Sequence, residues 1–182
     1  MPTENEKKFL ISNKCEKKIS RLAVEKYKIS QGYLIATRGI TVRVRKSATK
    51  LKTNYYFTLK VNTNGRCVEI ENKIDKRDFE DLWLIALNKL EKIRYEIKHK
   101  KEVWECDFFK DYLKNTYISI AEIEMPEGQK EPDSMPDIVK KNLKYKVAQN
   151  DDRFSNKLLG DPRYAQDLIK EIKSNTKYLK GN

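Results

Sequence analysis

The chain contains a series of short segments in which charged and apolar residues alternate. In one of them Arg43 and Arg45 alternate with Val42 and Val44. Successive side chains of an extended strand point to opposite faces, so residues two apart share a face. The pattern therefore predicts β-strands that each have one charged face and one apolar face.

Eight segments have this period-2 pattern. They are residues 4–11, 27–36, 40–46, 55–61, 66–74, 91–97, 103–109 and 117–124. Several are separated by short stretches with turn residues, such as Asn62-Thr63-Asn64-Gly65, which suit tight connections between neighbouring strands. We therefore expect a mainly antiparallel sheet.

Three further segments have helical patterns. Residues 76–87 carry a broad apolar face and follow Asp75, a suitable N-cap. Residues 136–143 and 161–172 each have a proline near the start, at Pro136 and Pro162, where proline is tolerated in a helix. The chain is therefore expected to be α+β and mainly β.

The charged residues of the strands come largely in pairs of one sign. The sets at this spacing are Glu4/Glu6 with Lys8, Arg43/Arg45, Thr58/Lys60, Glu69/Glu71, Lys92/Arg94, Glu105/Asp107 and Glu122/Glu124. An antiparallel sheet with one face in water also alternates in this way. Like charges close together cost energy, however, unless an opposite charge binds between them. The acidic pairs suit Mg²⁺ or Mn²⁺, which prefer oxygen ligands, and the basic pairs suit a chain of phosphates.

These faces can be reconciled in an eight-stranded closed β-barrel with its charged faces inside. The outward apolar faces would then need cover, which the apolar stripes of the three helices can supply. We expect the helices to pack on the outside of the barrel.

Length, charge and cysteine content set the remaining limits. A chain of 182 residues without a Pro/Gly/Ser-rich linker fits one domain, residues 1–182. Its net charge of +12 attracts anions, including phosphorylated small molecules and nucleic acids. The three cysteines form no CxxC pair, and there is neither a signal sequence nor a long apolar segment. A cytoplasmic protein without a membrane partner is expected.

The motifs resemble those of the CYTH superfamily, the triphosphate tunnel metalloenzymes. The family's ExExK motif corresponds to Glu4-Asn5-Glu6-Lys7-Lys8, and its QGYL strand to Gln31-Gly32-Tyr33-Leu34. Six further segments follow in the family order: Thr41-Val42-Arg43-Val44-Arg45, Thr58-Leu59-Lys60, Glu69-Ile70-Glu71, Lys92-Ile93-Arg94-Tyr95, Trp104-Glu105-Cys106-Asp107 and Ala121-Glu122-Ile123-Glu124. Residues 152–158 are similar to a C-terminal signature of the family. The resemblance spans most of the chain.

The resemblance implies an eight-stranded antiparallel tunnel and a role for each charged group. The implied phosphate contacts are Lys8, Arg43, Arg45, Lys60, Lys92 and Arg94, with Lys157 either reaching the tunnel or remaining solvated. The implied ligands of Mg²⁺ or Mn²⁺ are Glu4, Glu6, Glu69, Glu71, Asp107, Glu122 and Glu124. A metal-bound water would attack a terminal phosphorus, so that Glu4, Glu6, Lys8, Glu122 and Glu124 would be catalytic. Asp107, rather than Glu105, sits where the family usually has its acid.

By resemblance, the expected activity is hydrolysis of inorganic triphosphate to diphosphate and phosphate inside the tunnel. Class IV adenylyl cyclases and thiamine or nucleoside triphosphatases share the fold and stay open as alternatives. A non-enzymatic binder of polyphosphate or nucleic acid is a further alternative, and it would need the basic pairs but not the acidic ones. We expect a small-molecule triphosphate rather than nucleic acid as the partner, and a monomer or a homodimer.

Overall fold

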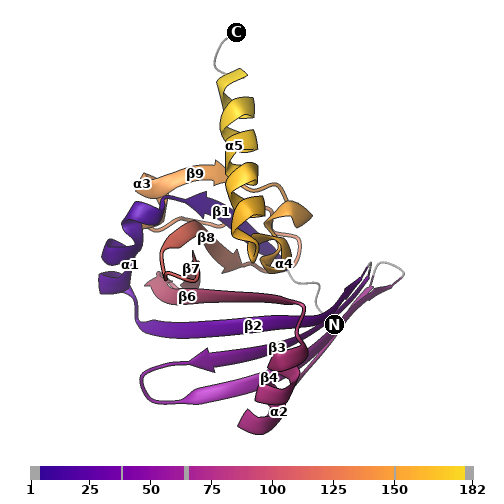
Figure 1. Ribbon diagram of the computed structural model, residues 1–182. Coiled ribbons are helices and arrows are strands. Elements are labelled where there is room, and N and C mark those ends of the chain that lie inside the picture. The colour runs from indigo at the N-terminus through magenta and orange to yellow at the C-terminus, as the bar shows by residue number, and fades with distance from the viewer. Residues whose placement is uncertain (1–4, 38, 64–65, 150, 179–182) are drawn as a thin grey trace.

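The computed structural model describes residues 5–37, 39–63, 66–149 and 151–178. Within these residues nine antiparallel strands form one sheet in the order β5-β4-β3-β2-β6-β7-β8-β1-β9 (Figure 1). The strands are β1 Glu6–Ile11, β2 Glu25–Thr37, β3 Ile40–Ala48, β4 Thr53–Thr63, β5 Arg66–Ile74, β6 Asn88–His99, β7 Glu102–Lys110, β8 Thr116–Glu124 and β9 Leu143–Lys146. All eight predicted strands are confirmed, and β9 is an additional one.

The sheet is curved, but it is not closed by hydrogen bonds. Strands β5 and β9 are its two ends, and among the described residues no ladder joins them. Part of the reason is β9. It pairs with one edge of β1 while β8 pairs with the other, so that part of β1 has no backbone hydrogen-bonding groups left for β5. The predicted closed barrel is therefore not confirmed, whereas the mainly-β α+β class is.

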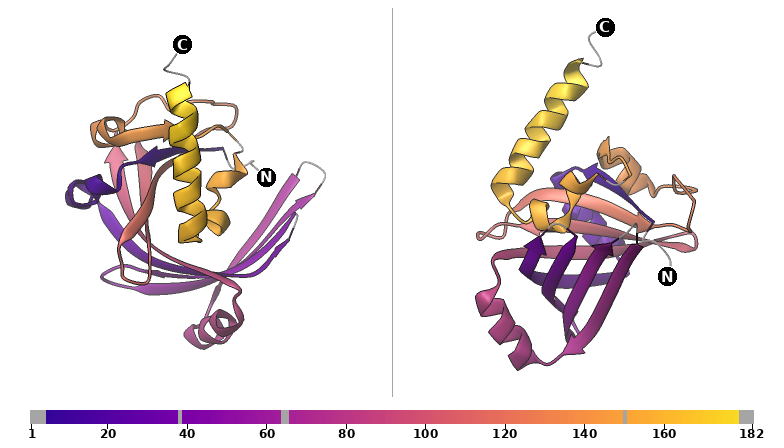
Figure 2. Two further views of the ribbon diagram at one scale, coloured as in Figure 1. Left: turned by 45° about the horizontal axis from the view of Figure 1, so that its top comes forward. Right: turned by 90° about the vertical axis from the view of Figure 1, so that its right-hand side faces the viewer.

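Helices lie on both sides of the sheet (Figure 2). They are α1 Glu16–Leu22, α2 Lys76–Ile85, α3 Asp137–Asn142, α4 Asn156–Leu159 and α5 Pro162–Tyr178, with short 3-10 turns η1 Asn13–Cys15 and η2 Asp152–Phe154. The three predicted helices correspond to α2, α3 and α5. As expected, Asp75 caps α2, and its side chain accepts a hydrogen bond from the Asp78 backbone at 2.8 Å. Helices α1 and α4 were not predicted from the sequence.

The apolar face of the central strands forms a core with α1 and α3. Trp104 and Phe9 are fully buried there, against Ile19 of α1 and Val139 of α3. Helix α2 covers another part of the side of the sheet that carries α1 and α3. There Gly32 of β2 allows the end of the helix to approach the strand closely. A Cβ atom at Gly32 would lie 2.8 Å from Cβ of Ala86, so any larger residue would displace the end of α2.

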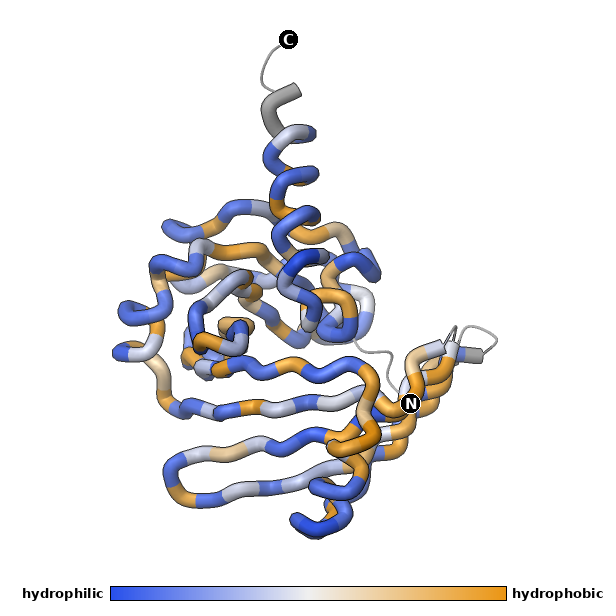
Figure 3. Tube along the Cα trace, in the orientation of Figure 1, coloured by the Kyte–Doolittle hydropathy of each residue, from blue (hydrophilic) through white to orange (hydrophobic). Residues whose placement is uncertain are grey.

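A second core lies on the charged side of the sheet. Ile118 and Ile120 of β8, which share a face with Glu122, are fully buried against Ala165 and Leu168 of α5. The apolar stripe of α5 therefore covers the charged side, in contrast to the expectation that all helices pack on the outside. Figure 3 shows that hydrophilic and hydrophobic residues alternate along the strands. None of the helices in the described part of the chain is both long enough and apolar enough to span a bilayer.

Candidate active site

The charged face of the sheet forms one wall of a cleft with a volume of about 700 Å³. The opposite wall comes from residues 147–149 and 151–158, which include η2 and the start of α4. The cleft brings together every residue predicted to contact phosphate: Lys8, Arg43, Arg45, Lys60, Lys92, Arg94 and Lys157. Glu6, Glu105 and Glu122 line it as well.

Asp107 of β7 lies beneath two of these cations and is completely buried. Its Oδ2 atom accepts hydrogen bonds from Lys92 Nζ at 2.5 Å and Arg94 Nη2 at 2.6 Å, and its Oδ1 atom accepts one from Arg94 Nε at 2.7 Å. The strand register explains the contact, because Arg94 of β6 is the direct cross-strand partner of Asp107. Burial acts to raise the pKa of Asp107, but Arg94 and Lys92 hold that pKa well below its usual range.

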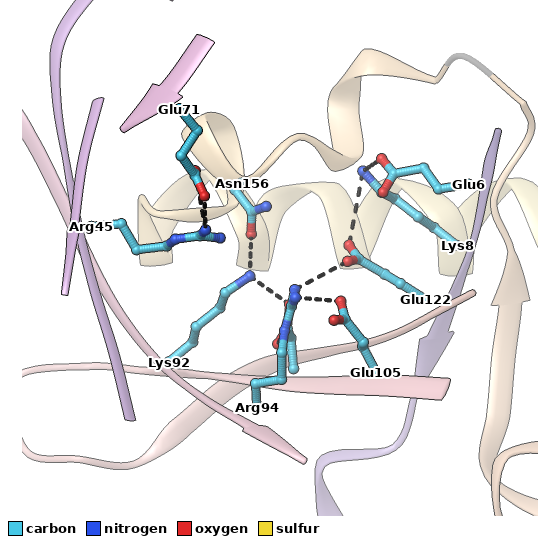
Figure 4. Close-up of polar contacts among 10 residues, drawn as sticks. Glu6, Lys8, Arg45, Glu71, Lys92, Arg94, Glu105, Glu122 and Asn156 are labelled. Atoms are coloured by element: carbon cyan, nitrogen blue, oxygen red, sulfur yellow. Dashed lines mark hydrogen bonds and ion pairs between the residues drawn. The ribbon is translucent and has the colours of Figure 1, made fainter. Parts of the chain in front are cut away.

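Arg94 contacts two further carboxylates (Figure 4). Its Nη2 atom donates to Glu122 Oε2 at 3.3 Å, and its Nη1 atom forms an ion pair with Glu105. Burial raises the pKa of Glu105, although Arg94 opposes the shift. The guanidinium is thus enclosed by three acids.

Glu122 also belongs to a group at the β1–β8 side of the cleft. Lys8 Nζ lies 2.7 Å from Glu6 Oε1 and 3.8 Å from Glu122 Oε1. Burial and the charge of Asp107 raise the pKa of Glu122, so its ionised form is poorly compensated in this structure. The pKa of Lys8 is also raised, since Glu122 and Glu6 outweigh the opposing effect of burial.

A second group of ion pairs occupies β3, β4 and β5. Arg43 Nη2 lies 3.2 Å from Glu69 Oε1, and Arg45 Nη2 lies 2.9 Å from Glu71 Oε1. Lys60 Nζ lies 3.5 Å from Glu69 Oε2.

The two arginines retain some capacity for another acceptor. The Nε atoms of Arg43 and Arg45 are buried and have no hydrogen-bond partner among the described residues. An unpaired buried donor is costly, and an anion in the cleft would satisfy it.

Asn156 at the start of α4 is a further site residue, one whose role was not predicted from the sequence. Its Oδ1 atom accepts a hydrogen bond from Lys92 Nζ at 2.8 Å. Asn156 does lie within the C-terminal signature, but its partner follows only from the way α4 packs across the sheet. The next residue, Lys157, donates from Nζ to the Ala36 carbonyl at 2.6 Å.

The acidic residues of β1 and β8 have the donor chemistry for a divalent cation. Glu6 is the direct cross-strand neighbour of Glu124, an arrangement of like charges that costs energy unless a cation lies between them. Glu122 lies on the same face and is buried, with its ion-pair partners at 3.3 and 3.8 Å. Carboxylate oxygens are the ligands that Mg²⁺ and Mn²⁺ prefer, so these residues fit such an ion.

The other predicted metal ligands are placed differently. Glu4 lies outside the described residues, and Glu124, the cross-strand neighbour of Glu6, is exposed and does not line the cleft. Asp107, Glu69 and Glu71 pair with the cations described above. Among the described residues no group of three His, Cys, Asp or Glu side chains is arranged to hold a metal ion. Metal binding therefore stays a prediction.

No protein-family model matches the sequence. No curated protein matches it either. Solved structures do resemble it. That of the inorganic triphosphatase NE1496 has a TM-score of 0.56 and 25% sequence identity, covering 85% of this chain and 95% of that one. In a second structure NE1496 is called a hypothetical protein; the TM-score is 0.57 and the identity 26%, covering 87% of this chain and 97% of that one.

A more distant structure shares the fold. The PH1819 protein from Pyrococcus horikoshii OT3 has a TM-score of 0.50 and 16% identity, covering 94% of this chain and 89% of that one. The fold shared with NE1496 and the order of the charged motifs along the strands agree with each other. Together they support the resemblance of the chain to the CYTH superfamily.

Proposed function

We propose that the protein is a divalent-metal-dependent triphosphatase that hydrolyses inorganic triphosphate to diphosphate and phosphate. The observation that carries this proposal is the convergence of seven predicted phosphate-binding cations on one cleft beside the carboxylates of β1 and β8. A non-enzymatic binder would need only the cations. The name of NE1496, an inorganic triphosphatase, supports the choice of substrate.

In the proposed mechanism the chain's own residues mainly bind and neutralise the phosphates. Arg43, Arg45 and Lys60 hold one end of the triphosphate. Lys92 and Arg94, on the cleft floor, hold its middle. The unpaired Nε atoms of the two β3 arginines support this role. Most of the barrier to phosphoryl transfer can be lowered by positioning and charge stabilisation, so the site needs no histidine.

Glu6, Glu122 and Glu124, together with Glu4, would hold Mg²⁺ or Mn²⁺. When bound, such an ion supplies neutralisation of phosphate charge and a lower pKa for the attacking water. Lys8 lies between Glu6 and Glu122, where it orients both carboxylates. From there it would also contact the phosphate that the metal ion neutralises. Glu69, Glu71 and Asp107 stay predicted ligands, and their present contacts orient the phosphate-binding cations.

The proposal is tested by replacing both acids of β8. We expect Glu122→Ala with Glu124→Ala to abolish phosphate release from inorganic triphosphate in the presence of Mg²⁺ or Mn²⁺. Glu127→Ala is the matched control, because Glu127 is exposed in the loop after β8 and does not line the cleft. It should retain wild-type turnover.

The substrate is tested by comparing inorganic triphosphate, ATP and thiamine triphosphate, with cyclic AMP measured in parallel. Faster turnover of either organic triphosphate, or cyclic AMP as the main product, would refute the proposed substrate. A wild-type protein without turnover, whose salt-sensitive RNA binding survives the double substitution, would instead identify a nucleic-acid binder.

A further inference from the structure

Arg94 has no free side for a phosphate in this structure. Its Nε and Nη2 atoms donate to Asp107, Nη2 also donates to Glu122, and Nη1 pairs with Glu105. A guanidinium binds a phosphate best with two parallel N–H groups. A phosphate chain must therefore displace at least one of the three carboxylates before Arg94 can bind it with two parallel N–H groups.

The three carboxylates differ in how firmly they are held. Asp107 is 0% exposed and also pairs with Lys92, whereas the Glu122 side chain is 10% exposed and also lies near Lys8. The Glu105 side chain is 35% exposed, lines the cleft, and among the ion pairs of the described residues contacts Arg94 alone. Glu105 is thus the carboxylate that can turn away at the lowest cost.

The strand register adds a second reason for Glu105 to leave. Its direct cross-strand neighbours are Glu96 on β6 and Glu122 on β8, so it stands between two residues of its own charge. Like charges directly opposite each other destabilise a sheet. Arg94 is the group that offsets this repulsion.

We propose that Glu105 competes with the phosphate chain for Nη1 of Arg94 and thereby weakens retention of substrate and of the diphosphate product. In this role Glu105 lowers the affinity of the cleft for phosphate chains: it leaves Arg94 when a phosphate chain enters and returns when the product departs. The inference rests on the proposed function, because it concerns the same cleft and the same class of ligand.

Equilibrium binding without metal tests the inference. Tripolyphosphate and diphosphate are titrated into the protein in the presence of a chelator, and heat is measured by calorimetry. Glu105→Gln keeps the shape of the side chain but removes its charge. We expect it to bind both ligands about fivefold more tightly than the wild type, the factor that corresponds to a partly exposed ion pair. Glu105→Ala, which cannot accept a hydrogen bond from Arg94, should gain at least as much.

Glu96→Gln is the matched control. It removes one negative charge from the neighbouring position, yet among the described residues Glu96 has no ion pair with Arg94. A general increase in positive potential would tighten binding equally in Glu105→Gln and Glu96→Gln. That result would overturn the inference. Unchanged or weaker binding by both Glu105 variants would overturn it too.

The two proposals can fail separately. A wild-type protein that hydrolyses triphosphate while the Glu105 variants gain no affinity retains the function and loses the inference. Tighter binding by the Glu105 variants in a protein without turnover supports the inference and refutes the hydrolase. In the active enzyme, Glu105→Gln should lower KM and strengthen inhibition by diphosphate without raising kcat, a pattern that structural damage does not produce.

Discussion

At the residue scale, the charge of the site depends on Asp107. The side chain makes no contact with solvent and is the carboxylate that Lys92 and Arg94 share, so it offsets part of the positive charge of these two adjacent cations. Removing one partner of a buried ion pair leaves an uncompensated charge and costs much more than the pair itself contributes. The same contacts fix the direction in which both cations point.

We therefore expect Asp107→Asn to lower the free energy of unfolding by about 3 kcal/mol. Urea denaturation at neutral pH measures the loss. Asp167→Asn is a suitable control, since Asp167 forms only an exposed pair with Lys170 on α5 and should change stability by less than about 0.5 kcal/mol. Equal stability of Asp107→Asn and the wild type would mean that the buried pairs do not form in solution.

The lowered pKa of Asp107 gives this prediction a pH dependence. Above the ordinary aspartate pKa of about 3.9, the residue is charged in the folded and unfolded chains and its stabilising contribution is complete. As pH falls below that value the unfolded chain binds the proton first, and the contribution declines toward the lower pKa of the folded state. The difference in stability between wild type and Asp107→Asn should therefore shrink as pH falls from about 5 to about 3.

Sequence spacing could predict which residues share the charged face, but not which of them touch. The pairs Lys92/Arg94 and Glu105/Asp107 were identified from a period of two. That Arg94 lies opposite Asp107 depends on the register of β6 against β7, which tertiary packing fixes. The family resemblance implies a metal-ligand role for Asp107, whereas its contacts with Lys92 and Arg94 do not follow from the spacing.

At the scale of elements, α2 shows how the predicted helices are held on the sheet. Phe79 is buried between Tyr55 of β4 and Trp83 of the helix itself, with ring centroids 5.2 and 5.5 Å away. Leu84 on the other side of the helix is 76% exposed. One apolar face therefore attaches α2 to β2, β3 and β4, although the helix has apolar residues on both sides.

Phe79→Ala should accordingly destabilise the protein by about 3 kcal/mol, because it opens a cavity beneath α2. Leu84→Ala removes an apolar side chain from the same helix and should cost less than about 0.5 kcal/mol. Thermal denaturation of the two variants provides the measurement. Similar losses for both would indicate that the second face of α2 is covered in solution.

The elements that could not be predicted are short and depend on their neighbours. Strand β9 has four residues, too few for its alternation to be distinguished from the end of α3, and it is a strand because the edge of β1 is available to it. Helix α4 is equally short. In contrast, the long strands and α5 contain enough turns or repeats of the pattern to be recognised from sequence.

At the scale of the whole molecule, an open sheet distributes stability unevenly. Strand β7 is paired on both sides, by β6 and β8, and lies over the core under α1. Within the part of the chain that the structure describes, β5 is paired on one side only, and its outward Ile70 is 48% exposed. Backbone amides open most readily where few apolar contacts cover them.

We expect hydrogen–deuterium exchange, followed by mass spectrometry, to be much faster in β5 than in β7. The rates for β4 and β3 should lie between the two. Protection of β5 equal to that of β7 in the absence of ligand would show that the edge is covered in solution, as it would be in a closed barrel. Strand β6, which lies between β2 and β7 in the sheet, provides an internal reference within each digest.

The position of β1 between β8 and β9 also has a consequence for synthesis on the ribosome. Phe9 leaves the ribosome more than a hundred residues ahead of Ala121 and Lys146, its cross-strand neighbours on β8 and β9. Until then the apolar strand Phe9-Leu10-Ile11 has neither of its partners, and contacts of this sequence separation form slowly. Strand β1 therefore emerges before either of its partners and is among the last strands to be incorporated into the sheet.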